Sequence, residues 1–226
     1  MKTLTYIQYF FYLGLNWNWR IAFHIINNES KGERKYGIHT TGADELKKTA
    51  ASGVDISHPT VYMPATYLLL EEVFTKLPPV ARKHFLDIGC GKGRALCVAL
   101  HHGFKKVSGI DFSKEFCEIA GTNLAATKKI FPSAETSIIH ADAANFKIPG
   151  DADCIFFFNP FDKVIMCEVA KNILDSYKKN PRTVYIIYLN PLHKKELIQI
   201  GFKEIYYTIK MKYMEAVILK KTAPGT

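Results

Sequence analysis

The sequence predicts an α/β protein: a doubly wound, mostly parallel sheet of seven strands that ends in an antiparallel hairpin. Three observations predict it. From about residue 60 onward, short apolar runs alternate with longer segments whose apolar residues recur at helical spacing. Strands that alternate with helices pair in parallel through right-handed crossovers. Near the C-terminal end the alternation stops, because two apolar runs follow each other with only a short link, which indicates a hairpin.

Each predicted element follows from its own local pattern. The stretch MPATYLLLEEVFTKL has a proline near its start and apolar residues at helical spacing, so we expect a helix. HFLDIG is a buried strand, the helix RALCVALHHG ends at Gly103, and Ser113 is the expected N-cap of the helix after the second strand. The predicted strands are HFLDIG, KVSGIDF, TSIIHADA, ADCIFFFNP, RTVYIIYLNP, FKEIYYTIK and MEAVILKK, and the two further helices are SKEFCEIAGTNLAATKKI and KVIMCEVAKNILDSYKK.

The first part of the chain departs from this pattern, and we expect a helical and loop extension over 1–58 before one domain over 59–226. Residues 6–26 are rich in aromatic side chains, but polar residues interrupt them too often for a membrane span. We expect a helix that packs on the domain, with contact to a membrane surface as the alternative. Residues 27–55 are polar and rich in Gly, Thr and Lys, which predicts a loop or cap segment.

The composition limits the kinds of binding partner and metal or disulfide site that the chain is expected to have. The chain has 30 Lys and Arg against 21 Asp and Glu, a formal net charge of +9. This excess favours an anionic partner such as a phosphate-bearing ligand, a nucleic acid or an anionic membrane face, although solvated lysine-rich faces are an equal alternative. The five cysteines form no C-x-x-C pair, and the histidines show no ligand spacing. We therefore expect reduced thiols in a cytoplasmic protein and no metal site.

Three glycines on alternate positions follow the first predicted strand: Gly89, Gly91 and Gly93. In an open parallel sheet, a ligand lies beyond the carboxyl ends of the strands, above the first strand-to-helix turn. Glycine there allows a tight turn and a close approach of the ligand. The dinucleotide pattern would need glycine at Arg94, and a P-loop would need Ser or Thr at Gly93. The turn is therefore expected to be the floor of another cofactor site.

The stretch LDIGCGKGR resembles the first motif of class I S-adenosylmethionine-dependent methyltransferases, D-x-G-x-G-x-G, with Asp87 as its acid. The ordered series YMPATY, FLDIGCGKGR, VSGIDFS, HADAANF, FFFNPF and YLNP is similar to a group of bacterial class I methyltransferases of undefined substrate. The resemblance covers residues 60–220, and KYGIHTTG extends it loosely toward the N-terminus. It implies a Rossmann-like fold with the terminal hairpin, and S-adenosyl-L-methionine as the cofactor.

The resemblance also assigns a cofactor site. Asp111 ends the second strand, where a carboxylate can accept hydrogen bonds from both ribose hydroxyls. Asp142 is expected to accept from the adenine amino group while the Ala143 N–H donates to the ring, with a helix cap as the alternative role for Asp142. Phe112 would stack on adenine, with a place in the core as the alternative, and Asp87 would order the loop or reach the methionine amino group through water. The expected cofactor-binding residues are Asp87, Gly89, Cys90, Gly91, Gly93, Asp111, Phe112, Asp142, Ala143 and Asn159.

The methyl acceptor is expected beside the fourth strand, where FFFNPFD contains Asn159, Pro160 and Phe161. Methyl transfer is an in-line displacement that needs little acid–base chemistry, so positioning of the lone pair supplies most of the catalysis. The Asn159 carbonyl can accept from an amine, and Phe161 can lie against a planar base or a cationic amine. A plain strand-ending turn is the alternative. Amino-directed relatives have two prolines at this place, and this chain has one, which disfavours an exocyclic base amine.

These residues predict an S-adenosylmethionine-dependent methyltransferase that acts on an amine nitrogen of a protein or a small molecule. A nucleic-acid methyltransferase is the first alternative, because basic pairs such as Lys178–Lys179 would suit RNA or DNA. A non-catalytic module that binds the cofactor is the second alternative.

Overall fold

A computed structural model describes residues 6–7, 10–11, 14–15, 18–41, 64–158, 161–210 and 214–223. The predicted acceptor residues Asn159 and Pro160 lie outside the described residues. So does the stretch from 42 to 63.

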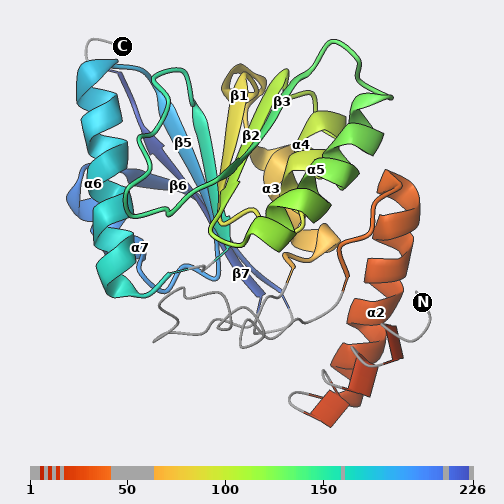
Figure 1. Cartoon of the computed structure of the whole chain (residues 1–226). Coiled ribbons are helices and arrows are strands. Elements are labelled where there is room, and N and C mark those ends of the chain that lie inside the picture. Colours follow the sequence, from red (N-terminus) through yellow and green to blue (C-terminus); the bar gives the residue numbers. More distant parts are fainter. Residues whose placement is uncertain are drawn as a thin grey trace.

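Seven strands form one sheet in the order β3-β2-β1-β4-β5-β7-β6 (Figure 1). The first five strands pair in parallel, while β7 pairs antiparallel with both β5 and β6. The predicted doubly wound sheet with its C-terminal hairpin is therefore confirmed. The strands are β1 (His84–Ile88), β2 (Lys106–Asp111), β3 (Glu135–His140), β4 (Cys154–Phe158), β5 (Val184–Leu189), β6 (Lys203–Lys210) and β7 (Met214–Lys221).

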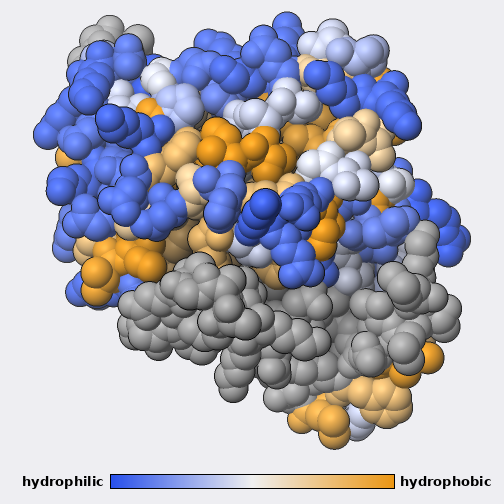
Figure 2. All heavy atoms as spheres, viewed as in Figure 1, coloured by the Kyte–Doolittle hydropathy of each residue, from blue (hydrophilic) through white to orange (hydrophobic). Residues whose placement is uncertain are grey.

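Helices cover both faces of the sheet, and each layer has its own apolar core. On one face α3 (Tyr67–Lys76), α4 (Arg94–His101) and α5 (Lys114–Lys128) pack on the sheet, and on the other α6 (Lys163–Lys179) and the short α7 (Lys194–Gln199) do. Mainly hydrophilic residues cover the outer surfaces of these layers (Figure 2). The strands β1, β4 and β5 are mostly apolar because both of their faces are buried, whereas the edge strands β3 and β6 are largely exposed.

Local signals fix the ends of several helices. The Ser113 hydroxyl accepts a hydrogen bond from the Phe116 N–H at the start of α5, so the predicted N-cap is confirmed. Thr66 caps α3 and Asp162 caps α6 in the same way. Two elements were not predicted, α7 and the 3-10 turn η2 (Pro79–Ala81), because each is too short to show a periodicity.

The N-terminal region differs from its prediction. The helix α2 (Trp19–Tyr36) begins only at its N-cap Asn18, so residues 6–26 do not form one uninterrupted helix. The same helix continues to Tyr36 and ends at Gly37, whose φ of 66° is left-handed. The expected loop over 27–55 is therefore helical in its first part. This polar part can be helical because two of its acids, Glu29 and Glu33, are buried against the rest of the protein.

Helix α4 packs closely against β2, and this packing positions the turn between β1 and α4. A side chain at Gly109 of β2 would place its Cβ 2.6 Å from Leu96 Cδ1 and 2.9 Å from the Cys90 Sγ. Only glycine permits this approach. The turn after β1 is thereby held directly above the end of β2.

Candidate functional site

The turn after β1 has the backbone that its three glycines predict. Gly89, Gly91 and Gly93 have φ values of 84°, 50° and 81°, all in the left-handed region. The backbone N–H groups of Gly89 and Cys90 both donate to the Ile110 carbonyl, at 2.9 and 2.8 Å. The turn is therefore tied to the end of β2 at the carboxyl edge of the sheet.

Gly93 also allows α4 and α5 to pack closely. Its Cβ would lie 3.1 Å from the Cα and Cβ of Ala120, and its φ is unfavourable for any side chain. We expect Gly93→Ala to lower the free energy of unfolding by roughly 1–2 kcal/mol, the cost of a left-handed alanine. Urea denaturation measures this change. The matched control is Gly121→Ala, in the middle of α5 with no neighbour within 4 Å, which should raise stability slightly. Equal effects of the two changes would contradict the strain assigned to Gly93.

Asp111, at the end of β2, connects the turn to the carboxyl edge. It is 6% exposed, its Oδ2 accepts the Gly91 N–H at 2.8 Å, and its Oδ1 accepts the Ser113 N–H at 2.9 Å. Burial raises the pKa of this carboxyl, and these backbone donors act against that rise. Each carboxylate oxygen has a second lone pair. Asp111 is thus a fixed acceptor that can still receive two hydroxyl hydrogens.

Asp87, the acid of the first motif, is buried deeper. It is 2% exposed, and its Oδ1 has no hydrogen-bond partner among the described residues. Burial, and secondly the charge of Asp111, raise the pKa of Asp87 well above its usual range. A buried carboxyl without donors is costly unless something compensates it. A cationic ligand beside the turn would supply that compensation.

Asp142 lies next to Asp111, as expected for two residues after neighbouring strands. The Ala141 N–H donates to the Asp111 carbonyl at 3.0 Å. The Asp142 carboxylate itself closes a turn, since it accepts from the Ala144 N–H at 3.0 Å and from Asn145 Nδ2 at 2.7 Å. The side chain remains exposed, so these turn contacts leave lone pairs for a ligand. The adenine contact stays a prediction.

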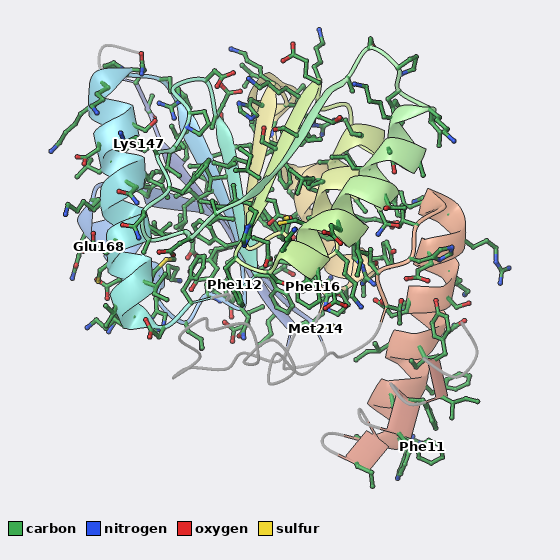
Figure 3. All side chains as sticks on the ribbon, viewed as in Figure 1. Phe11, Phe112, Phe116, Lys147, Glu168 and Met214 are labelled. Carbon is green, nitrogen blue, oxygen red and sulfur yellow. The ribbon has the colours of Figure 1, made fainter. Side chains whose placement is uncertain are left out.

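The other predicted site residues are divided between the surface and the core. Phe112 is 37% exposed and lies at the carboxyl edge of the sheet (Figure 3). The Cys90 side chain is buried in the core under α4, so its predicted contact would be made by backbone. Ala143 and Phe161 are half-buried and pack against the core on the α6 side. Their roles toward cofactor and acceptor remain predictions.

A buried ion pair that the sequence did not predict lies beside the glycine turn. Arg94, the first residue of α4, is 3% exposed, and both of its terminal nitrogens contact the Glu29 carboxylate, with Nη1 to Oε1 at 2.8 Å. Arg94 also donates to Thr40 Oγ1 at 2.7 Å and to the Ala65 carbonyl at 2.9 Å. Its guanidinium lies 4.1 Å from the centre of the Tyr67 ring. Arg94 thus joins α2, the segment after it and α3 at one point.

A second buried acid of α2 fixes the segment after that helix. Glu33 Oε1 accepts the N–H groups of Thr40 and Thr41, at 2.6 and 2.7 Å. Burial by itself would raise the pKa of Glu33, but these donors hold it below the usual range. On the other side of the segment, Asn123 of α5 accepts the His39 N–H at 3.1 Å and donates to the Lys92 carbonyl in the glycine turn at 3.0 Å. The N-terminal region is therefore anchored to the turn itself.

One signal in the sequence could have revealed these contacts. Glu29 and Glu33 continue the helical spacing of Ala22 and Ile25, so they share the buried face of α2. A basic residue directly after the third glycine is the complementary charge. The polarity of the stretch concealed this pattern. Acidic residues in a polar stretch indicate an exposed loop, unless a buried basic partner is known.

Two features are absent from the part of the chain that the structure describes. No group of three or more His, Cys, Asp and Glu side chains there could hold a metal ion. No helix in the described part of the chain is both long and apolar enough to cross a membrane.

Residues 85–180 match a family model described as a methyltransferase domain. Solved structures share the fold at low sequence identity. The protein yhhF of Escherichia coli has a TM-score of 0.52 at 14% identity, over 71% of this chain and 90% of that one. An S-adenosylmethionine-dependent methyltransferase of Mesorhizobium loti has 0.51 at 13%, over 69% and 97%. The methyltransferase domain of bacterial CtHen1-C has 0.54 at 16%, over 69% and 97%. No curated protein sequence matches the chain.

Proposed function

We propose that this chain is a class I S-adenosylmethionine-dependent methyltransferase and that it transfers the methyl group of its cofactor to an amine nitrogen of a protein or a small molecule. The single observation that best supports the site is the pair of buried carboxyls at the carboxyl edge, Asp87 and Asp111. Asp111 is oriented by two backbone donors, as a ribose acceptor needs to be. The Oδ1 of Asp87 has no hydrogen-bond partner among the described residues, which suits a neighbour that carries positive charge.

The cofactor supplies an electrophilic methyl group on a cationic sulfur. The protein must therefore bind the cofactor and the acceptor, orient them, and exclude water. The left-handed glycine turn leaves the backbone bare where a ligand would approach, and Asp111 holds that turn through the Gly91 N–H. Asp87, at the end of β1, would place a negative charge beneath the cationic part. The charge of these residues and the absence of side chains at the glycines suit S-adenosyl-L-methionine.

The proposed acceptor rests on the Asn-Pro-Phe sequence that follows β4. An amide carbonyl at Asn159 would accept a hydrogen bond from the acceptor amine and orient its lone pair toward the methyl group. Phe161, directly before the N-cap of α6, would provide an apolar wall for that amine. The acidic character of the carboxyl edge also favours an amine over an anionic acceptor.

The test is transfer of tritium from methyl-labelled cofactor into a fractionated bacterial lysate, followed by protease or nuclease treatment. Label that is released by protease, or that passes into the small-molecule filtrate, supports the proposal. Label that only nuclease releases contradicts it and favours a nucleic-acid acceptor. Binding without any transfer in any fraction would indicate the non-catalytic module. An Asp111→Asn preparation controls for labelling by contaminating enzymes.

Asp111→Asn should weaken cofactor binding by roughly 1.5–3 kcal/mol, the range for hydrogen bonds to a charged group. The amide also places an NH₂ against one of the two backbone N–H donors at Gly91 and Ser113. Isothermal titration calorimetry with S-adenosyl-L-methionine measures the change. Asp175→Asn, an exposed acid on α6, is the matched control and should leave affinity unchanged. Unchanged affinity in the Asp111 variant would remove this carboxylate from the cofactor site.

Asp87 should make both stability and cofactor affinity depend on pH. Folding raises the pKa of this carboxyl, so its stabilising effect is complete below the unfolded-state pKa and is lost as the pH rises through the folded-state pKa. Above that pH, Asp87→Asn should unfold at a higher temperature than the parent because no buried charge forms. The same variant should bind the cationic cofactor more weakly. Thermal unfolding and calorimetry across the neutral and alkaline range test both effects, and a variant that is less stable at every pH would contradict them.

A further inference from the structure

Five large apolar side chains remain exposed on α2 and on the helical residues before it. They recur every four residues before and within α2, and their exposed fractions lie between 46% and 77%. We call this set the N-terminal apolar patch; it consists of Ile7, Phe11, Leu15, Trp19 and Phe23.

The patch is continuous across two helical segments. Tyr6 donates to Glu33 near the end of α2 at 3.0 Å, whereas Phe11 contacts Trp19 at its start, with ring centres 5.9 Å apart. The described residues before α2 therefore run back along it. A side chain at Gly14 would collide with the Trp19 ring, so the two segments touch closely at this end. The patch residues before α2 and those within α2 thus meet at the contact between Phe11 and Trp19.

Among the described residues of α2, the exposed charges have one sign. Both acids of α2, Glu29 and Glu33, are buried in contacts with the rest of the protein. The exposed charged side chains of this helix are all basic: Arg20, Lys31, Arg34 and Lys35. Among these, Lys35 pairs with Glu71 of α3, and Arg20 directly follows Trp19. An apolar surface with aromatic residues and a basic flank is the pattern of a helix that lies in a membrane interface.

The Phe11 end of the patch lies on the same side of the molecule as the carboxyl edge of the sheet. In Figure 3, Phe11 lies at the far end of the N-terminal segment, beyond the edge at which Phe112 and Met214 lie. Figure 2 shows apolar residues gathered at that same end. A flat surface that contacts the patch would therefore face the side from which the proposed acceptor enters.

We propose that the N-terminal apolar patch docks the protein on an anionic lipid bilayer, with the helices in the plane of the interface. No described helix can cross a membrane, so the contact is interfacial. Trp, Phe and Leu side chains would enter the boundary between headgroups and acyl chains, and the basic residues would contact anionic headgroups. A second copy packed on this patch would bring like charges together, which disfavours a symmetric dimer.

The two tryptophans of the chain provide a direct readout, because Trp17 and Trp19 both belong to this region of the sequence. Vesicles of phosphatidylglycerol and phosphatidylcholine should shift the tryptophan emission to the blue, and the protein should sediment with them. Vesicles of phosphatidylcholine alone should bind at least about tenfold more weakly, since the electrostatic attraction is absent. No methyl acceptor is needed, so a failure here is distinguishable from a failure of the proposed function.

The variant Phe11→Ser/Phe23→Ser should bind anionic vesicles at least about tenfold more weakly, because two exposed aromatic rings are lost from the contact. The matched control is Val80→Ser/Ile130→Ser, which changes two exposed apolar residues outside the patch and should bind as the parent does. Equal binding of parent and patch variant, or no binding of the parent, would overturn the proposal. So would a dimer of the parent in light scattering that the patch variant loses.

Discussion

Arg94→Met is expected to lower the free energy of unfolding by about 3–5 kcal/mol, because it removes one member of a buried ion pair and leaves the other buried without a partner. Glu29 is 1% exposed, and besides Arg94 its carboxylate accepts a hydrogen bond from the Thr41 hydroxyl, at 3.1 Å, which would remain with methionine at position 94. The change also removes the stack on Tyr67 and the hydrogen bond to the Ala65 carbonyl. Urea denaturation followed by circular dichroism measures the loss.

Two controls separate burial from simple loss of charge. Lys194→Met breaks an ion pair of similar length with Glu204, at 2.7 Å, but this pair is solvent-exposed and should cost less than about 1 kcal/mol. The double variant Arg94→Met/Glu29→Leu should recover part of the loss, since no unpaired charge stays buried. If Arg94→Met costs no more than Lys194→Met, the buried pair does not stabilise the fold as described.

The same variant should weaken cofactor binding at temperatures where it remains folded. Arg94 directly follows Gly93, so the helix start that it anchors is also the end of the cofactor turn. Because Asn123 still joins the Lys92 carbonyl to His39, the turn keeps one of its two anchors, and binding should be reduced rather than abolished. Full native affinity would show that the pair stabilises α2 without positioning the turn.

Asn159→Ala is expected to lower turnover by about a hundredfold or more while cofactor affinity changes far less. The estimate follows from the cost of misplacing a reacting group, because the amide is proposed to align the acceptor nitrogen. Loss of rate without loss of cofactor binding marks an interaction made on the way to the transition state. Single-turnover rates and calorimetry measure the two quantities once an acceptor is found. Asn159→Asp should retain some activity with an amine, since a carboxylate still accepts its hydrogen bond.

The chain contains its own control for this experiment. A second Asn-Pro pair, Asn190 and Pro191, follows β5, where we expect a wall of the cleft without a part in the chemistry. Asn190 has a φ of 50°, so glycine is the replacement that keeps its backbone unstrained. Asn190→Gly should leave turnover near that of the parent. If both variants lose activity equally, or Asn159→Ala loses none, Asn159 has no specific role in catalysis.

Among the predicted site residues, those that depend on strand ends were easiest to place. Asp87 and Asp111 each close a short apolar run, and parallel strands bring their carboxyl ends to one edge of the sheet. The sequence could not show that Asp111 would receive the Gly91 N–H, or that an oxygen of Asp87 would be left without a donor. Both facts depend on how the turn folds back over β2.

By itself, the sequence determined the alternation of strands and helices, the C-terminal hairpin and the glycine turn, because each depends on the spacing of neighbouring residues. Only the tertiary structure decided that α2 extends through a polar stretch, since its acids are satisfied by partners such as Arg94, 65 residues away. It also decided the character of the N-terminal surface. Because Glu29 and Glu33 turn inward, aromatic and basic side chains are left facing outward, and such long-range pairings are invisible to any local pattern.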